Sequence, residues 1–113
     1  MKIIWEDQLE IEEVDEEGYK ETYQTVVIGP DEDSDNIRME LYRIESGGET
    51  ALHKHPREHL IRIEKGEGVV FSEIDGKFKV SPGQNIFIPA DEEHQFQNPY
   101  SDPFEFVIIT PEE

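Results

Sequence analysis

Cysteine is absent from the 113 residues of this sequence, which excludes a disulfide framework, a thiolate nucleophile and a metal held by thiolates. Positive charge is scarce: 10 lysines and arginines stand against 28 aspartates and glutamates, giving a formal net charge of −18 at pH 7. Because this charge repels phosphate groups, we expect neither nucleic acid nor an anionic membrane surface as a partner.

Long apolar runs are absent as well. No stretch approaches the ~20 apolar residues that a membrane-spanning helix requires. The first ten residues, MKIIWEDQLE, turn acidic and are not followed by the small-residue cleavage site of a secretory signal. We therefore expect a cytoplasmic protein. The length is typical of one domain, and the sequence predicts a single domain over residues 1–113.

The chain does contain a series of short apolar runs that end at glycine, proline or clusters of polar residues. Such runs, rich in β-branched and aromatic residues or alternating with charges, are typical of β-strands. The dipeptide Asp75-Gly76 predicts a two-residue hairpin turn, and Ser46-Gly47-Gly48 predicts the end of a strand. Together these features indicate an all-β sandwich or barrel. The predicted strands are 22–28, 37–44, 60–64, 69–74, 77–80, 85–88 and 104–110.

The N-terminal third is less regular. Residues 10–17 (EIEEVDEE) hold six acids, and such a charge run is typical of a solvated face or a loop. Ile3, Ile4 and Trp5 form a short apolar segment before it, which would pack either on the barrel or on a second subunit.

Four histidines carry the functional argument: His53, His55, His59 and His94. Alternate residues of a strand point to the same side. The first three histidines share parity with Ile61, a candidate core residue, whereas Glu58 has the opposite parity. If the odd face is the core, three imidazoles line a pocket and Glu58 points away from it. Because clustered imidazoles are costly to bury without partners, a divalent cation that takes their lone pairs is the favoured explanation.

The spacing of these residues resembles the two motifs of the cupins. The first motif is matched by Gly47, His53, His55, position 59 and Gly66, and the second by Gly83, Pro89, His94 and Asn98. The resemblance covers about residues 37–110 and implies a cupin-type double-stranded β-helix, or jelly-roll barrel. Residues 1–36 then add N-terminal strands and the acidic segment.

Most cupins have glutamate where this chain has His59. The resemblance therefore implies one divalent transition metal per chain, held by His53, His55, His59 and His94 in an all-histidine site. Similar small cupins favour manganese as the metal, while imidazole ligands also suit Fe, Ni, Cu and Zn. They also favour a homodimer, in agreement with the 104–109 segment (FEFVII), which is apolar on both faces.

Three functions fit such a site. The leading prediction is a metal-dependent enzyme acting on a small organic molecule, of the oxygenase or other oxidoreductase type. The first alternative is a non-catalytic module that binds a small ligand or the metal, and the second is an isomerase or lyase that exploits Lewis acidity. The sequence assigns no catalytic base: a metal-bound hydroxide, or a Glu or Tyr from elsewhere in the fold, would have to serve.

Overall fold

The computed structural model describes residues 1–112. In this part of the chain, strands account for nearly all of the regular structure. Two short 3-10 turns, η1 (Glu6–Gln8) and η2 (Pro30–Glu32), make up the rest. The all-β prediction is therefore confirmed. The strands are β1 (Glu12–Glu13), β2 (Lys20–Ile28), β3 (Ile37–Glu49), β4 (His59–Lys65), β5 (Gly68–Ser72), β6 (Gly76–Val80), β7 (Asn85–Ile88), β8 (His94–Gln97) and β9 (Phe104–Pro111).

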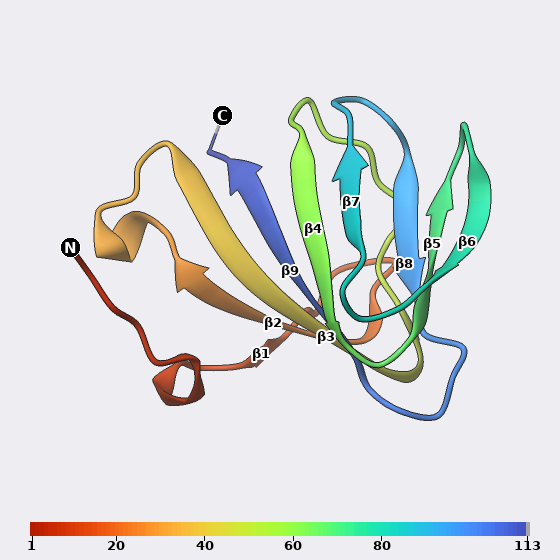
Figure 1. Cartoon of the computed structure of the whole chain (residues 1–113), viewed down its shortest axis with the longest axis horizontal. Helices are drawn as coiled ribbons and strands as arrows, with labels where there is room; N and C mark the ends of the chain where they lie inside the picture. The colour runs from red at the N-terminus through yellow and green to blue at the C-terminus, as the bar shows by residue number, and fades with distance from the viewer. Residues whose placement is uncertain (113) are drawn as a thin grey trace.

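The strands form one curled antiparallel sheet in the order β6-β5-β8-β3-β9-β4-β7, and β2 pairs with β3 while β1 pairs with β2. Figure 1 shows the sheet curling from β1 and β2 on one side of the molecule to β5 and β6 on the other. The long strand β3 pairs with β9 along most of its length and with β8 at its end, so it joins the two halves of the barrel. Within residues 1–112, no helix is long and apolar enough to cross a membrane.

The barrel interior takes one face of each strand. In β4, His59, Ile61 and Ile63 are buried, whereas Leu60 and Arg62 are exposed. The predicted parity is thus confirmed, and the odd-numbered face that carries His59 is the core face. The core cluster is closed by large apolar side chains from the other strands: Ile44, Val70, Val80, Ile88, Phe96, Phe104 and Phe106.

The prediction that Ser46-Gly47-Gly48 ends a strand was wrong. Strand β3 continues through both glycines to Glu49, where it pairs with Gln97 of β8. The reason is that Gly47 adopts a φ of 83°, which bends the strand without ending it. Beyond the bend, Gly48 O accepts a hydrogen bond from Asn98 N at 2.9 Å. This bend carries the chain across the barrel toward the histidines.

The hairpin at Asp75-Gly76 exists, but its loop is longer than predicted. Ser72 pairs with Gly76, so the loop consists of residues 73–75 and Gly76 belongs to β6. Gly76 has a φ of 86°, the conformation that glycine supplies at the end of three-residue hairpin loops. The side chain of Ser72 accepts hydrogen bonds from the backbone of Ile74 and Asp75, which stabilises the longer loop.

Two strands escaped the sequence prediction. Strand β8 is only four residues long, and β1 is a two-residue strand inside the acidic run, where both of its side chains are exposed as expected. Ile3 and Trp5 are 82% and 71% exposed and Ile4 is half-buried, so two of the three apolar side chains of this segment are not covered within the chain. The alternative, that it packs on a second subunit, stays a prediction.

Candidate metal centre

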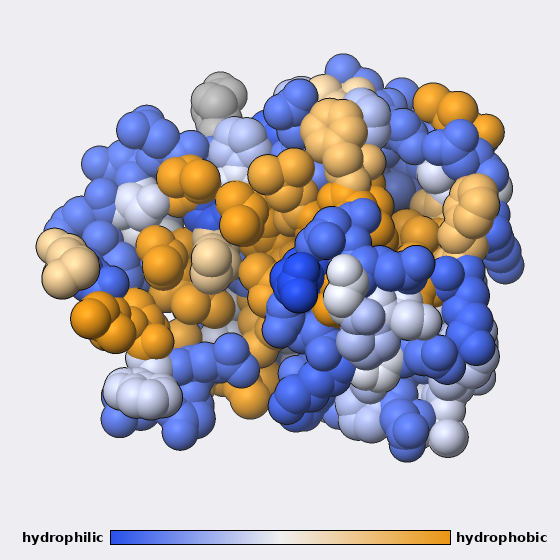
Figure 2. All heavy atoms as spheres, in the orientation of Figure 1, coloured by the Kyte–Doolittle hydropathy of each residue, from blue (hydrophilic) through white to orange (hydrophobic). Residues whose placement is uncertain are grey.

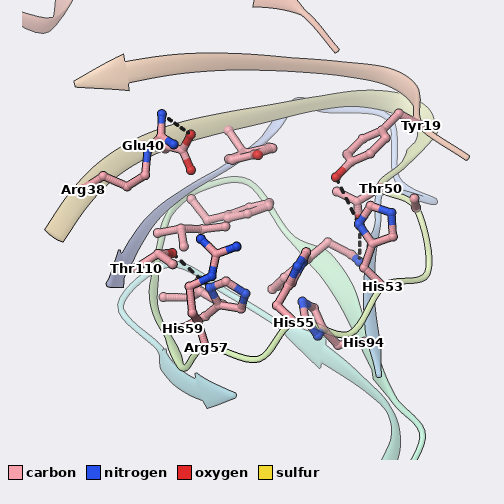
Figure 3. Close-up of a pocket in the computed structure, with 16 residues that line it drawn as sticks. Tyr19, Arg38, Glu40, Thr50, His53, His55, Arg57, His59, His94 and Thr110 are labelled. Carbon is pink, nitrogen blue, oxygen red and sulfur yellow. Dashed lines mark hydrogen bonds and ion pairs between the residues drawn. The ribbon is translucent and has the colours of Figure 1, made fainter. Parts of the chain in front are cut away.

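Three of the four predicted histidines converge in the barrel. His55 lies in the segment that leads into β4, while His59 and His94 are the first residues of β4 and β8. One ligand atom from each lies within 4.8 Å of the other two. The ring centroids are 5.0 Å apart for His55 and His59 and 5.4 Å apart for His59 and His94. Figure 3 shows the three rings grouped on one side of a cavity.

Two of the three histidines, His59 and His94, are held by hydrogen bonds at Nδ1. His94 Nδ1 lies 2.9 Å from the carbonyl oxygen of Glu92. Since a carbonyl can only accept, Nδ1 carries the proton and the lone pair belongs to Nε2. His59 Nδ1 likewise lies 2.9 Å from the hydroxyl of buried Thr110. Partners of this kind fix the orientation of metal-ligating imidazoles, so the arrangement fits a metal bound at Nε2 of His59 and of His94.

His53 lies beside the cluster and is not one of its three histidines. Its backbone pairs with that of His94 in an isolated antiparallel bridge, and its ring centroid is 5.3 Å from that of His55. The hydroxyl of Tyr19 lies 3.5 Å from His53 Nδ1, on the edge of hydrogen-bonding distance. The structure thus brings His53 next to the cluster, and its role as a fourth ligand remains a proposal.

The surroundings of His55 and His59 favour the neutral form of these two imidazoles. Burial lowers the pKa of His59 to about 4, and the neighbouring His55, His94 and Arg57 lower it in the same direction. The pKa of His55 is also lowered, mainly by burial and then by its histidine and arginine neighbours. Neutral rings offer the lone pairs that a metal needs.

The cavity beside the histidines measures about 170 Å³ and has two different walls. The histidines and Arg57 form one wall, and Arg38 and Glu40 of β3 form the opposite one, as Figure 3 shows. Its floor is apolar. It includes Phe96, whose ring centroid is 6.3 Å from that of His94. A small organic molecule therefore has a polar and an apolar surface to bind.

Glu40 is a site residue that the sequence analysis missed. Only 9% of it is exposed, and burial raises the pKa of its carboxyl group. One carboxylate oxygen, Oε2, accepts a hydrogen bond from Gln24 and lies 3.6 Å from Arg38 Nη2. The available signal was parity, because Glu40 lies on the same face of β3 as the fully buried Ile44.

A family model described as "Cupin domain" matches residues 40–110, which is more than half of the chain. The chain belongs to the cupin family. This membership and the curled sheet together confirm the predicted cupin jelly roll. The motif positions also have structural roles in this cupin. Asn98, for example, is 1% exposed and its side-chain amide donates to the carbonyl oxygens of Ile44 and Asp102 at 2.8 Å each.

Several solved structures share this fold. The polyketide cyclase RemF from Streptomyces resistomycificus is 29% identical with a TM-score of 0.94, over 100% of this chain and 80% of the cyclase. A predicted oxalate decarboxylase from Thermotoga maritima is 18% identical with a TM-score of 0.87, over 97% and 98% of the two chains. A cupin-2 domain from Rhodospirillum rubrum is 20% identical with a TM-score of 0.85, over 100% and 75%. No curated protein sequence matches this cupin.

Proposed function

We propose that this cupin is a metal-dependent enzyme that acts on a small organic molecule and holds one divalent transition metal through His53, His55, His59 and His94. The observation that carries the proposal is the cluster of His55, His59 and His94, whose ligand atoms lie within 4.8 Å of one another at the wall of a cavity. The resemblance to small cupins favours manganese, and the all-nitrogen ligands also suit Fe, Ni, Cu or Zn.

The fourth ligand in this proposal is His53. Paired residues of an antiparallel bridge place their side chains on the same face of the sheet, so His53 projects on the side from which His94 reaches the cluster. Its Nδ1 faces the Tyr19 hydroxyl, which leaves Nε2 as the atom for a metal. Because His53 is not within the 4.8 Å cluster, its ring would have to turn toward the other three to make the fourth bond.

When bound, a divalent cation on four neutral ligands would supply Lewis acidity to an oxygen atom of the substrate. The similarity to a polyketide cyclase supports a non-redox reaction of this kind, such as ring closure beside a carbonyl group. The oxidoreductase function, favoured by the family resemblance, uses the same residues and is the second candidate. The two are separable because only an oxygenase would consume dioxygen.

Glu40 supports an enzyme over a module that only binds. It is the one carboxylate that lines the cavity among the described residues. Its Oε2 is engaged by Gln24 and Arg38, while Oε1 makes no hydrogen bond to residues 1–112. A carboxylate oriented through one oxygen and free at the other suits proton transfer, and a raised pKa brings it closer to the working pH. We assign Glu40 the transfer of a proton to or from the substrate.

The experiment is metal analysis of untagged protein, followed by screening of small dicarbonyl and phenolic compounds with the metal-loaded and the metal-free protein. The reactions are run in air and under nitrogen with an oxygen electrode. We expect turnover that depends on the metal and persists under nitrogen. Turnover that stops under nitrogen would favour the oxidoreductase, and a protein that takes up no transition metal would overturn the proposal.

A further inference from the structure

We propose that the substrate of this site is a small organic anion, a carboxylate or an enolate, and that Arg57 binds its negatively charged oxygen. The inference rests on the proposed metal site and names the substrate class for it. It starts from the position of Arg57, which follows Pro56 in the segment between two of the histidines and lines the same cavity. Figure 3 shows its guanidinium group over His59, on the cavity side of the ring.

Arg57 has no protein partner within residues 1–112. In a chain with 28 acids and 10 bases, carboxylates are abundant, and the other three arginines, Arg38, Arg43 and Arg62, all form ion pairs. Arg57 forms none, although Glu58 is its neighbour in sequence. A guanidinium group presents planar, paired donors that match the two oxygens of a carboxylate. Its donors at the cavity are therefore available to a ligand.

The distribution of charge in the cavity also favours an anionic ligand near Arg57. Arg38 lies between two carboxylates, at 3.6 Å from Glu40 and 3.3 Å from Glu112, so this wall carries no excess of positive charge. The histidine wall carries the positive Arg57, and no carboxylate within residues 1–112 lines the cavity on that side. A divalent cation bound there would add to that positive charge. An anion with one oxygen toward the metal and one toward Arg57 would compensate both.

The size of the site limits the ligand to a small molecule. The cavity measures about 170 Å³ and its floor is made by apolar side chains, among them Ile61, Phe96 and Ile108. A short aliphatic or aromatic group would pack on this floor while the anionic group reaches the histidine wall. The net charge of −18 would slow the approach of such an anion, and the local positive charge would hold it once it arrives.

The test compares pyruvate with pyruvamide, which has the same shape without the negative charge. Isothermal titration calorimetry measures the binding of each to cobalt-loaded protein. We expect the wild-type protein to bind pyruvate more tightly than pyruvamide, and Arg57→Gln to weaken pyruvate binding by roughly tenfold or more while changing pyruvamide binding by less than about twofold. Arg57→Lys keeps the positive charge but lacks the paired donors. Its affinity for pyruvate should therefore lie between those of the wild-type protein and Arg57→Gln.

The matched control is Arg62→Gln, because Arg62 is an arginine of the outer face that pairs with Glu64. It should leave both affinities unchanged. Metal content is measured on every variant, so that a protein without cobalt reports on the metal site and not on Arg57. If wild-type protein carries cobalt but does not prefer pyruvate, or if cobalt-loaded Arg57→Gln keeps the preference, the role of Arg57 is overturned and the metal site stands. If wild-type protein takes up no cobalt, the proposed function falls first.

Discussion

His53 and His94 lie directly opposite each other in the barrel. The backbone N–H of His53 donates to the carbonyl oxygen of His94 at 3.0 Å, and that of His94 donates to the carbonyl oxygen of His53 at 2.8 Å. This bridge joins the segment of the first cupin motif to that of the second. The bridge fixes the distance between the two backbones, and so brings His53 of the first motif next to His94 of the second.

The first prediction concerns the ligand set. His94→Ala should remove most of the bound metal, since it deletes a ligand whose other ring nitrogen is held by Glu92. His59→Glu should retain the metal, because a carboxylate oxygen also binds first-row cations, but it lowers the charge of the site by one and should alter the turnover. Metal analysis after gel filtration measures both variants.

Lys54→Ala is the control for these variants, since Lys54 lies between two of the histidines and is exposed. It should keep the full metal content. Retention of full metal by His94→Ala would show that the histidine is not a ligand, and the proposed function would fall with it.

The second prediction concerns Thr110, whose hydroxyl holds His59 Nδ1 at 2.9 Å. Thr110→Val keeps the volume but removes the partner of the imidazole, and the loss of such partners typically weakens metal binding by about 10- to 100-fold. Competition with a chelator of known affinity measures the change. Thr25→Val, at a buried threonine away from the cavity, should leave the metal affinity alone. Equal effects of the two variants would contradict a specific role for Thr110.

The third prediction is a pH dependence of the metal-free protein. The pKa of His59 in the folded chain is about 4, below the value of about 6.5 in an unfolded chain. Between these values the unfolded state binds a proton that the folded state does not, so the free energy of unfolding should fall as the pH drops from 6.5 toward 4. Above pH 6.5 His59 is neutral in both states and should not change the free energy of unfolding with pH.

Thermal melts in the presence of a chelator measure this dependence from pH 4.5 to 8. His59→Gln removes the titrating group and should make the decline less steep than in the wild-type protein. Identical slopes for the two proteins would mean that His59 is not the buried neutral residue described above.

The sequence predicted the histidine face because the parity of a strand and the spacing of the motifs are local properties. It did not reveal Glu40 as a site residue, since its inward direction depends on which face of β3 becomes the core. It also ended β3 too early, because a single glycine at positive φ bends a strand that continues through pairing with β8. Neither strand parity nor motif spacing could predict the direction of Arg57. It lies in an irregular segment, where the direction of a side chain is set by tertiary contacts.

The fourth prediction tests the proton-transfer role of Glu40. Once a substrate is found, Glu40→Gln should lower kcat by roughly 10²- to 10⁴-fold, the range typical of general acid–base catalysis, and should leave the metal content unchanged. The amide retains the size of the side chain and a partner for Gln24. Glu64→Gln, at an exposed acid on β4, is the control. A Glu40→Gln protein with full kcat would contradict the assignment.

The fifth prediction is a homodimer formed through the outer face of the sheet. Leu60 of β4 and Phe87 of β7 are 53% and 55% exposed, and they line an apolar groove on that face together with Val107 and Ile109 of β9. Figure 2 shows apolar side chains gathered in the middle of the molecular face that it draws. Contiguous apolar surface of this kind is typical of a protein–protein interface, and a two-fold axis would bury the same face on both copies.

Light scattering should therefore give twice the 13.2 kDa mass of one chain at micromolar concentration. The double variant Leu60→Lys, Phe87→Lys places two positive charges in the groove and should give the mass of one chain, with the melting curve showing that it still folds. Lys77→Glu, on the distant strand β6, changes charge without touching this face and should remain a dimer. A wild-type protein that stays a single chain at these concentrations would overturn the prediction, and the exposed groove would then have to bind a different partner.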